Sequence, residues 1–245
     1  MPTPTIAAVV VNHNTSLFTE LALRSLFAQH TALRPVKIVV YDNDSTDDTS
    51  ALRAFAATPG FAWVPSGFPL GTRNNSHGEI LRRFVLEHPD CSHYLFLDTD
   101  VVFVQPETIQ IMLAELDADP TTFGIGARQS WDGLVPVPAE ILRANPNIQD
   151  ARLHPCCALV ANTALFRTIV EAIGLSAANY LWAERDEYLD TFALLTRVMR
   201  THGLYHRISR ALVRHFFTVS YDYDDPATRA YKLNERDRLL AALRA

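Results

Sequence analysis

The first hundred residues repeat one pattern, in which a short apolar run, a polar cluster and a stretch of helical periodicity follow one another. The apolar runs cover residues 6–11, 36–41, 61–64 and 94–97. Because they are short and rich in β-branched and aromatic residues, without regular apolar–polar alternation, they predict strands buried on both faces. The stretches between them predict helices over residues 17–30, 49–57 and 74–88. This order is typical of an α/β fold with a mostly parallel sheet flanked by helices.

The polar clusters follow directly after three of the predicted strands, at residues 12–16, 42–48 and 98–100. The carboxyl ends of parallel strands meet at one edge of a sheet, and ligands of such folds bind at that edge. The sequence therefore predicts that these three clusters converge on a ligand site.

Beyond Pro120 the pattern becomes less regular. It predicts strands over residues 122–127 and 204–208, further apolar segments over 154–160 and 212–217, helices over 163–173 and 184–202, and a charged tail after residue 221. The helix over 184–202 has a strongly acidic start. Neither an internal repeat nor a long linker interrupts the chain, so we expect a single domain whose second half is more variable.

Composition narrows the class of protein. With 22 Lys and Arg against 27 Asp and Glu, the net charge is −5. This argues against a nucleic-acid binder, which needs a clustered basic excess to neutralise phosphates. The apolar run at 6–11 is far too short to span a bilayer, and no basic segment of a signal peptide precedes it. The three cysteines (Cys91, Cys156 and Cys157) have no zinc-site spacing. We expect a reduced, cytoplasmic protein.

Asp98-Thr99-Asp100 is the sharpest chemical signal. Two carboxylates one residue apart, just past a buried strand, suit a divalent cation that prefers oxygen ligands and could bridge the phosphates of a nucleotide. The alternative is that both carboxylates only solvate the end of the strand.

Four motifs together resemble the GT-A-fold, family-2-like glycosyltransferases. They are VVVNHN, VVYDNDSTDDT, GFPLGTRNNSHG and YLFLDTD, in that order and spacing. The resemblance covers residues 6–104 and is traceable over 150–220. It implies a Rossmann-like, mostly parallel sheet flanked by helices in one domain, with a nucleotide-sugar-binding half (1–104), an acceptor and catalytic half (105–221) and a helical tail (222–245).

The implied function is Mn²⁺- or Mg²⁺-dependent transfer of a sugar from a nucleotide-diphosphate donor to an acceptor hydroxyl, with inversion. The resemblance places Val11, Asn12 and Asn14 at the base and ribose, and Asp42 at the base. It places Arg73, Asn74 and Thr99 near the donor. Capping of a helix start is the alternative for Asp42, although Asp44 and Asp47 are better placed for it. For Arg73 the alternative is an exposed arginine at a helix start.

The resemblance also supplies a set of metal ligands. Asp100 is the first, Asp98 contacts the ribose or, through water, the metal, and His215 is the third ligand. The alternative for His215 is a core histidine among its apolar neighbours.

The catalytic base is expected among the acidic residues of 184–190. An inverting transfer needs one carboxylate to take the proton of the acceptor hydroxyl. Asp186, Glu187 and Asp190 share one face of the predicted helix, and their mutual repulsion would raise one pKa. Counting back from Gly203 favours Asp190, with Asp186 and Glu187 in reserve. The alternative is an acidic turn that complements the helix dipole.

The acceptor side is marked only by residues 129–132, where Trp131 would suit sugar stacking or structural packing. The acceptor could be a glycan, a lipid-linked sugar, a protein or a small molecule, and a membrane-bound acceptor would be reached peripherally. Two other functions stay open. Asp98 also fits the nucleophile of haloacid-dehalogenase-like phosphatases, although it follows the fourth predicted strand instead of the first. A nucleotide-sugar-binding module without catalysis would keep Asp42, Asp98 and Asp100 but lack a base.

Overall fold

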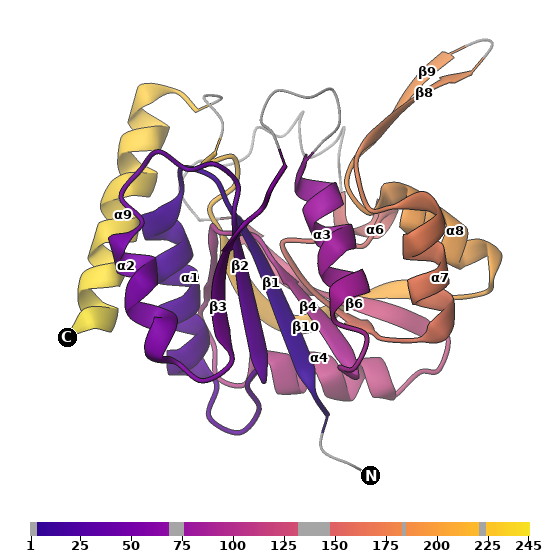
Figure 1. Ribbon diagram of the computed structural model, residues 1–245, viewed down its shortest axis with the longest axis horizontal. Coiled ribbons are helices and arrows are strands. Elements are labelled where there is room, and N and C mark those ends of the chain that lie inside the picture. The colour runs from indigo at the N-terminus through magenta and orange to yellow at the C-terminus, as the bar shows by residue number, and fades with distance from the viewer. Residues whose placement is uncertain (1–3, 69–75, 132–147, 183–184, 221–223) are drawn as a thin grey trace.

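The computed structural model describes residues 4–68, 76–131, 148–182, 185–220 and 224–245 (Figure 1). Along the chain the elements are β1 (Ile6–Asn12), α1 (Ser16–Gln29), β2 (Lys37–Asp42), α2 (Ser50–Arg53) with a 3-10 helix (Ala54–Ala57), β3 (Phe61–Pro65), α3 (Ser76–Glu87), β4 (His93–Leu97), β5 (Val101–Phe103), α4 (Thr108–Asp117), β6 (Thr122–Trp131), α6 (Ile148–Ala151), β7 (Cys157–Ala161), α7 (Ala164–Ile173), β8 (Ala178–Trp182), β9 (Arg185–Leu189), α8 (Ala193–Thr201), β10 (Tyr205–His215) and α9 (Pro226–Arg244).

Within the described residues, one eight-stranded sheet has the order β3-β2-β1-β4-β7-β6-β10-β5. The pairs β3–β2, β2–β1, β1–β4 and β6–β10 are parallel. Strand β7 runs antiparallel to both β4 and β6, and β5 runs antiparallel to β10. This confirms the predicted α/β fold with a mostly parallel sheet. Strands β8 and β9 form a separate antiparallel hairpin that projects from the body in Figure 1.

The sheet buries both faces, which explains why its central strands read as continuous apolar runs. In β1, Ile6, Ala8 and Val10 face one core together with side chains of α1, α2 and α4. Ala7 and Val9 face a second core with α3, α7 and α8. All five are at most 2% exposed, so substitution by a polar residue would desolvate a polar group on either face.

Helix α9 lies outside the layers formed by the sheet and the helices on its two faces, and it packs on α1 (Figure 1). Phe18, Leu21, Val102, Phe216 and Leu240 form a small third core between them. The buried carboxylate of Glu20 accepts hydrogen bonds from Arg24 at 2.7 Å and from Arg244 Nε at 2.9 Å. These contacts dock the C-terminal helix against the first helix of the chain.

The predicted helix over 184–202 is wrong. Residues 185–189 form strand β9, which pairs with β8, and only residues 193–201 are helical. Phe192 has a φ of +69°, and a left-handed residue at this point prevents one helix from running through it. The argument that Asp186, Glu187 and Asp190 share a helix face therefore fails.

Three other elements differ from the prediction. The sequence pattern gave no element for β5 or for α4. Strand β10 unites the two segments predicted at 204–208 and 212–217, because a shift of its register against β6 between Ile208 and Leu212 lets the strand continue past Ser209 and Arg210. Among the described residues no helix is both long and apolar enough to cross a membrane.

Candidate functional site

The three polar clusters converge as predicted at the carboxyl edge of the sheet. Parallel pairing places Asn12 beside Asp42 and Val10 beside Leu97, the residue that precedes Asp98. A cavity of about 460 Å³ opens at this edge. Its lining includes Val11, Thr99, the carboxylates of Asp98 and Asp100, and residues from the second half of the chain.

Asp98, Asp100 and His215 meet at the floor of this cavity. One ligand atom from each lies within 4.8 Å of the others. His215 Nε2 is 3.1 Å from Asp100 Oδ1 and 3.8 Å from Asp98 Oδ2. Asp100 and His215 are almost fully buried, whereas Asp98 is partly exposed to the cavity.

The sheet explains how residues 115 positions apart come together. Strand β5 starts at Val101, which pairs with His215 at the end of β10. The backbone N–H of Phe216 donates to the carbonyl of Asp100 at 3.0 Å, and the N–H of Asp98 donates to the carbonyl of Cys156 at 2.8 Å. These backbone bonds hold the main chain around Asp98, Asp100 and His215 together at the edge of the sheet.

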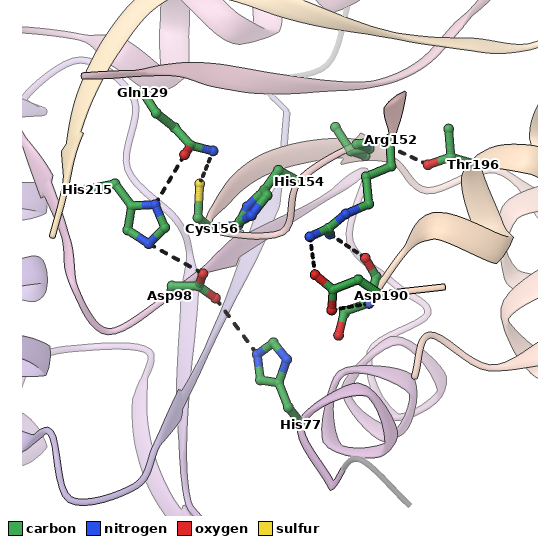
Figure 2. Close-up of polar contacts among 11 residues, drawn as sticks. His77, Asp98, Gln129, Arg152, His154, Cys156, Asp190, Thr196 and His215 are labelled. Carbon is green, nitrogen blue, oxygen red and sulfur yellow. Dashed lines mark hydrogen bonds and ion pairs between the residues drawn. The ribbon is translucent and has the colours of Figure 1, made fainter. Parts of the chain in front are cut away.

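Gln129 orients His215. The Nε2 amide of Gln129 donates to Cys156 Sγ at 2.9 Å, so its Oε1 faces His215 Nδ1 at 3.2 Å (Figure 2). The oxygen can only accept, and Nδ1 of His215 therefore carries the proton. This directs Nε2 toward the two carboxylates, the arrangement by which outer residues orient a metal-binding histidine. The sequence placed Gln129 on the acceptor side, and the structure gives it this contact instead.

Burial and neighbouring charges shift the pKa values of three residues at the site. Burial raises the pKa of Asp98, against the opposing effect of His77 and His215. For His215, burial acts to lower the pKa, but the carboxylates of Asp100 and Asp98 outweigh it and the pKa is raised. The neighbouring His154 has its pKa lowered well below its usual value by burial and by the positive charges of Arg152 and His215.

These residues fit a divalent cation. Two carboxylates and one imidazole nitrogen can approach one ion, and the Gln129 contact leaves Nε2 of His215 directed at the same point. Carboxylate oxygens suit Mg²⁺ and Mn²⁺, and an imidazole ligand shifts the preference toward a transition ion such as Mn²⁺. The raised pKa of His215 means that a proton competes with the cation for Nε2, so binding of a cation would release it.

Asn12 supports the loops instead of facing the cavity. It is fully buried, and its Nδ2 donates to Ser45 Oγ at 2.9 Å and to Ser16 Oγ at 3.2 Å. Its Oδ1 accepts from the hydroxyls of Thr19 and Thr15 at 2.7 and 3.2 Å. Since these bonds occupy the whole carboxamide, its predicted contact with a nucleoside has no unoccupied side-chain atom to use.

Asn14 and Asp42 lie beside the cavity and are not among the described residues that line it. Asn14 Oδ1 accepts from the backbone N–H of Thr46 at 2.7 Å. Asp42 Oδ1 lies 3.5 Å from Asn12 Nδ2, and Asp48 accepts from the N–H of Ser50 at the start of α2. The capping alternative for Asp42 is therefore wrong, and its contact with a base stays a prediction.

The sequence suggested that Asp47 caps the helix after β2, but in the structure it caps α1. Its carboxylate accepts from the backbone N–H of Ser16 at 2.8 Å and from the Ser16 hydroxyl at 2.9 Å. It therefore caps α1 from the loop after β2, which ties the first two polar clusters together.

Of the three predicted bases, Asp190 lines the cavity. Its Oδ1 accepts from the N–H of Thr191 at 2.7 Å, and its Oδ2 forms an ion pair with Arg152 (Figure 2). Arg152 is buried and also donates to the carbonyl of Thr191. The Asp190 side chain is nevertheless 45% exposed, so the carboxylate is accessible.

The other predicted residues have different positions. Glu187 forms an ion pair with Arg197 of α8 and does not line the cavity within the described part of the chain. The side chain of Asp186, which belongs to β9, lies outside the described residues, as do Arg73, Asn74 and the side chain of Trp131.

The cavity residues that sequence reasoning missed include His77, Arg152, His154 and Tyr188. His77 Nε2 lies 3.8 Å from Asp98 Oδ1. The sequence feature that could have identified His77 is its place in the GTRNNSHG motif. Gly78, the next residue, lets α3 pack closely on the segment before β8, because a Cβ there would lie 2.2 Å from Ser176 Cα. Arg152 and His154 precede β7, and their spacing alone does not reveal that β7 inserts beside β4.

No protein-family model and no curated protein matches the sequence. Solved structures do. The mannosyltransferase PcManGT from Pyrobaculum calidifontis, in complex with GDP-mannose and Mn²⁺, aligns over 99% of this chain and 75% of its own, with a TM-score of 0.61 and 16% identity. Glucosyl-3-phosphoglycerate synthase from Mycobacterium tuberculosis aligns over 98% of this chain and 79% of its own, with a TM-score of 0.55 and 17% identity. The chain has the fold of these glycosyltransferases.

This glycosyltransferase fold is the one that the four sequence motifs implied. At 16–17% identity the similarity concerns the arrangement of the chain. The chemistry has to be argued from the cavity itself.

Proposed function

We propose that this protein is a glycosyltransferase that moves a sugar from a nucleotide-diphosphate donor to an acceptor hydroxyl with the help of Mn²⁺. The observation that carries the proposal is the cluster of Asp98, Asp100 and His215, with Gln129 fixing the imidazole, at the floor of the cavity. One structure with the same fold is a complex with GDP-mannose and Mn²⁺, and another is a complex with Mn²⁺ and UDP-glucose.

The residues divide into a donor side and an acceptor side. The end of β1 contributes Val11 to the lining, and the loops after β2 and β4 contribute Asn43 and Thr99. We assign the nucleotide to these residues. Asp98, Asp100 and His215 would hold the cation, which stabilises the charge of the leaving diphosphate when bound. Mg²⁺ remains the alternative to Mn²⁺.

Asp190 is the proposed base. In the reaction a bond forms between the acceptor oxygen and the anomeric carbon, while the bond from that carbon to the diphosphate breaks. The hydroxyl proton passes to a carboxylate, and attack opposite to the leaving group inverts the configuration. Asp190 lines the same cavity as Asp98, and Arg152 holds it in place through the ion pair.

Thermal unfolding in the presence of nucleotides tests the donor site. UDP, GDP, dTDP and CDP are each added with and without Mn²⁺, and a ligand at 100 times its Kd stabilises the folded state by about 2.7 kcal/mol. For a domain of this size that corresponds to a rise in Tm of roughly 5–10 °C. We expect a rise that requires Mn²⁺ for one of the four nucleotides.

Asp100→Asn should abolish this rise, whereas Asp90→Asn, an exposed carboxylate in a turn, should leave it unchanged. If no nucleotide raises Tm with Mn²⁺, the proposed function is wrong, and hydrolysis of an aryl phosphate would then test the phosphatase alternative. Nucleotide binding without release of nucleoside diphosphate from any nucleotide sugar would favour the binding module.

A further inference from the structure

The ammonium group of Lys232, in the middle of α9, is buried near the cavity. Its side chain is 8% exposed. Nζ donates to the carbonyl of Phe217 at 2.9 Å and to Asp224 Oδ2 at 2.8 Å, and it lies 3.4 Å from Thr218 Oγ1. A buried charge is costly unless it is paired and hydrogen-bonded, and among the described residues these partners all belong to the segment between β10 and α9.

This segment has an unusual backbone at the point where Lys232 contacts it. Phe217 and Thr218 have φ values of +54° and +52°. Residues with a Cβ rarely adopt this conformation, and it persists only where the surroundings impose it. The bond from Lys232 to the Phe217 carbonyl is such a constraint, because it fixes the peptide group between the two left-handed residues.

Phe217 in turn packs on His215. Their ring centroids are 3.9 Å apart with an angle of 39° between the planes. The imidazole is thus held on one side by this ring and at Nδ1 by Gln129. Phe217, Thr218 and Val219 also line the cavity, so a shift of this segment would change both the orientation of His215 and the cavity wall.

The position of Lys232 depends on the docking of α9. Leu240 packs in the third core, and Arg244 pairs with the buried Glu20 of α1. Both contacts lie C-terminal to Lys232 along the helix, and Asp225 caps the N-terminus of the helix. Helix α9 is therefore anchored through its C-terminal half, and the bond from Lys232 to the Phe217 carbonyl ties its middle to the segment after His215.

We propose that Lys232 is a positioning residue of the metal site: it holds Phe217 in its left-handed conformation so that the phenyl ring fixes His215 for the cation. The inference rests on the proposed function and adds the C-terminal helix to the parts of the chain on which that function depends.

Mn²⁺ affinity measured without substrate tests this inference. The free Mn²⁺ signal in electron paramagnetic resonance gives the Kd at a temperature at which each variant is folded, as checked by circular dichroism. Disturbing a residue that orients a metal ligand weakens binding by about 10- to 100-fold. We expect Lys232→Met to weaken Mn²⁺ binding in this range, and Arg238→Met to leave the Kd unchanged. Arg238 is on the same helix, 66% exposed, and pairs with Glu235.

A double-mutant cycle shows whether Lys232 acts through Phe217. If it does, Lys232→Met has little further effect on the Kd in a Phe217→Leu background, because the ring that it positions is already absent. Fully additive effects would overturn the proposed route. Should Lys232→Met not fold, Asp224→Asn keeps the lysine, weakens its fixation, and must weaken Mn²⁺ binding in the same direction.

A purely structural role gives a different result. If Lys232 only stabilises the fold, the Tm of Lys232→Met falls while the Kd of the folded variant for Mn²⁺ equals that of the wild type. This result would overturn the inference and leave the proposed function standing. If the wild-type protein itself binds no Mn²⁺, the proposed function fails and this inference fails with it.

Discussion

Gln129 and His215 face each other across neighbouring strands, and the carboxamide oxygen of Gln129 accepts the Nδ1 proton of His215 at 3.2 Å. The other ring nitrogen of His215 is 3.1 Å from Asp100. A single neutral side chain thus determines which nitrogen of the histidine is directed at the two carboxylates.

Replacing Gln129 should weaken metal binding without removing a ligand. In Gln129→Ala the imidazole loses its acceptor and can rotate or change tautomer, so we expect Mn²⁺ affinity to fall by roughly 10- to 100-fold. Isothermal titration calorimetry measures the Kd, and Gln110→Ala, an exposed position on α4, is the control. An unchanged Kd in Gln129→Ala would show that the packing of Phe217 alone is sufficient to orient His215.

The identity of the base can be tested by comparing two carboxylates. Asp190 lines the cavity, whereas Glu187 is paired with Arg197. We expect Asp190→Asn to lower turnover by roughly 10²- to 10⁴-fold while nucleotide-induced stabilisation stays at the wild-type level. Glu187→Gln should keep turnover within a few-fold of wild type. If Glu187→Gln lowers turnover more than Asp190→Asn does, the base is Glu187 of β9.

His30 should make the protein less stable at mildly acidic pH. Its ring is fully buried, with Nδ1 2.7 Å from the carbonyl of Leu26 and Nε2 accepting from the N–H of Ile109 at 3.1 Å. Nε2 can accept only in the neutral form of the ring, and burial lowers the pKa of His30 below 6.5. The unfolded chain therefore binds a proton near pH 6.5 that the folded protein does not bind, so stability falls as the pH drops below this value.

Urea unfolding between pH 7.5 and pH 5 measures this dependence. One such histidine contributes at most about 1.4 kcal/mol per pH unit. In His30→Gln the slope should decrease but not vanish, because His88, His93 and His154 also have lowered pKa values. The exposed His202→Gln should keep the wild-type slope. An equal slope in both variants would contradict the prediction.

Gly78 should not tolerate a methyl group. A Cβ at this position would meet Ser176 Cα at 2.2 Å, which forces backbone to move away from backbone. We expect Gly78→Ala to destabilise the fold by roughly 1–3 kcal/mol, the usual range for overpacking. Gly126→Ala is the matched control, since its Cβ would meet its nearest neighbours at an ordinary 3.7 Å. Chemical denaturation with an unchanged m value reports the difference.

The sequence predicted the parts of this protein that local patterns determine. Continuous apolar runs such as residues 36–41 identify central strands whatever lies around them, and the polar residues after them identify the edge where ligands bind. The resemblance of the motifs supplied the meeting of Asp98 and Asp100 with His215, which no local pattern could indicate, because it depends on the pairing of β5 with β10.

The predictions that failed concern residues whose structure depends on distant parts of the chain. The acidic residues of 184–190 satisfied the rule for a helix start, but pairing between β8 and β9 and the left-handed Phe192 decided the structure of this segment. Arg152 and His154 gave no signal because their importance comes from the neighbours that β7 and α8 provide. Leu153 N–H, for example, donates to Thr196 of α8 at 3.1 Å.

The ion pair between Glu20 and Arg244 joins residues 224 positions apart. A contact of such separation gains nothing until the intervening chain is already ordered, so α9 is expected to dock late in folding and to be released early in unfolding. Release of α9 would also remove Lys232 from Phe217 while the sheet is still intact. With increasing denaturant, the protein should therefore lose its affinity for Mn²⁺ before it loses its strands. Native-state hydrogen exchange should find the amides of α9 less protected than those of β1.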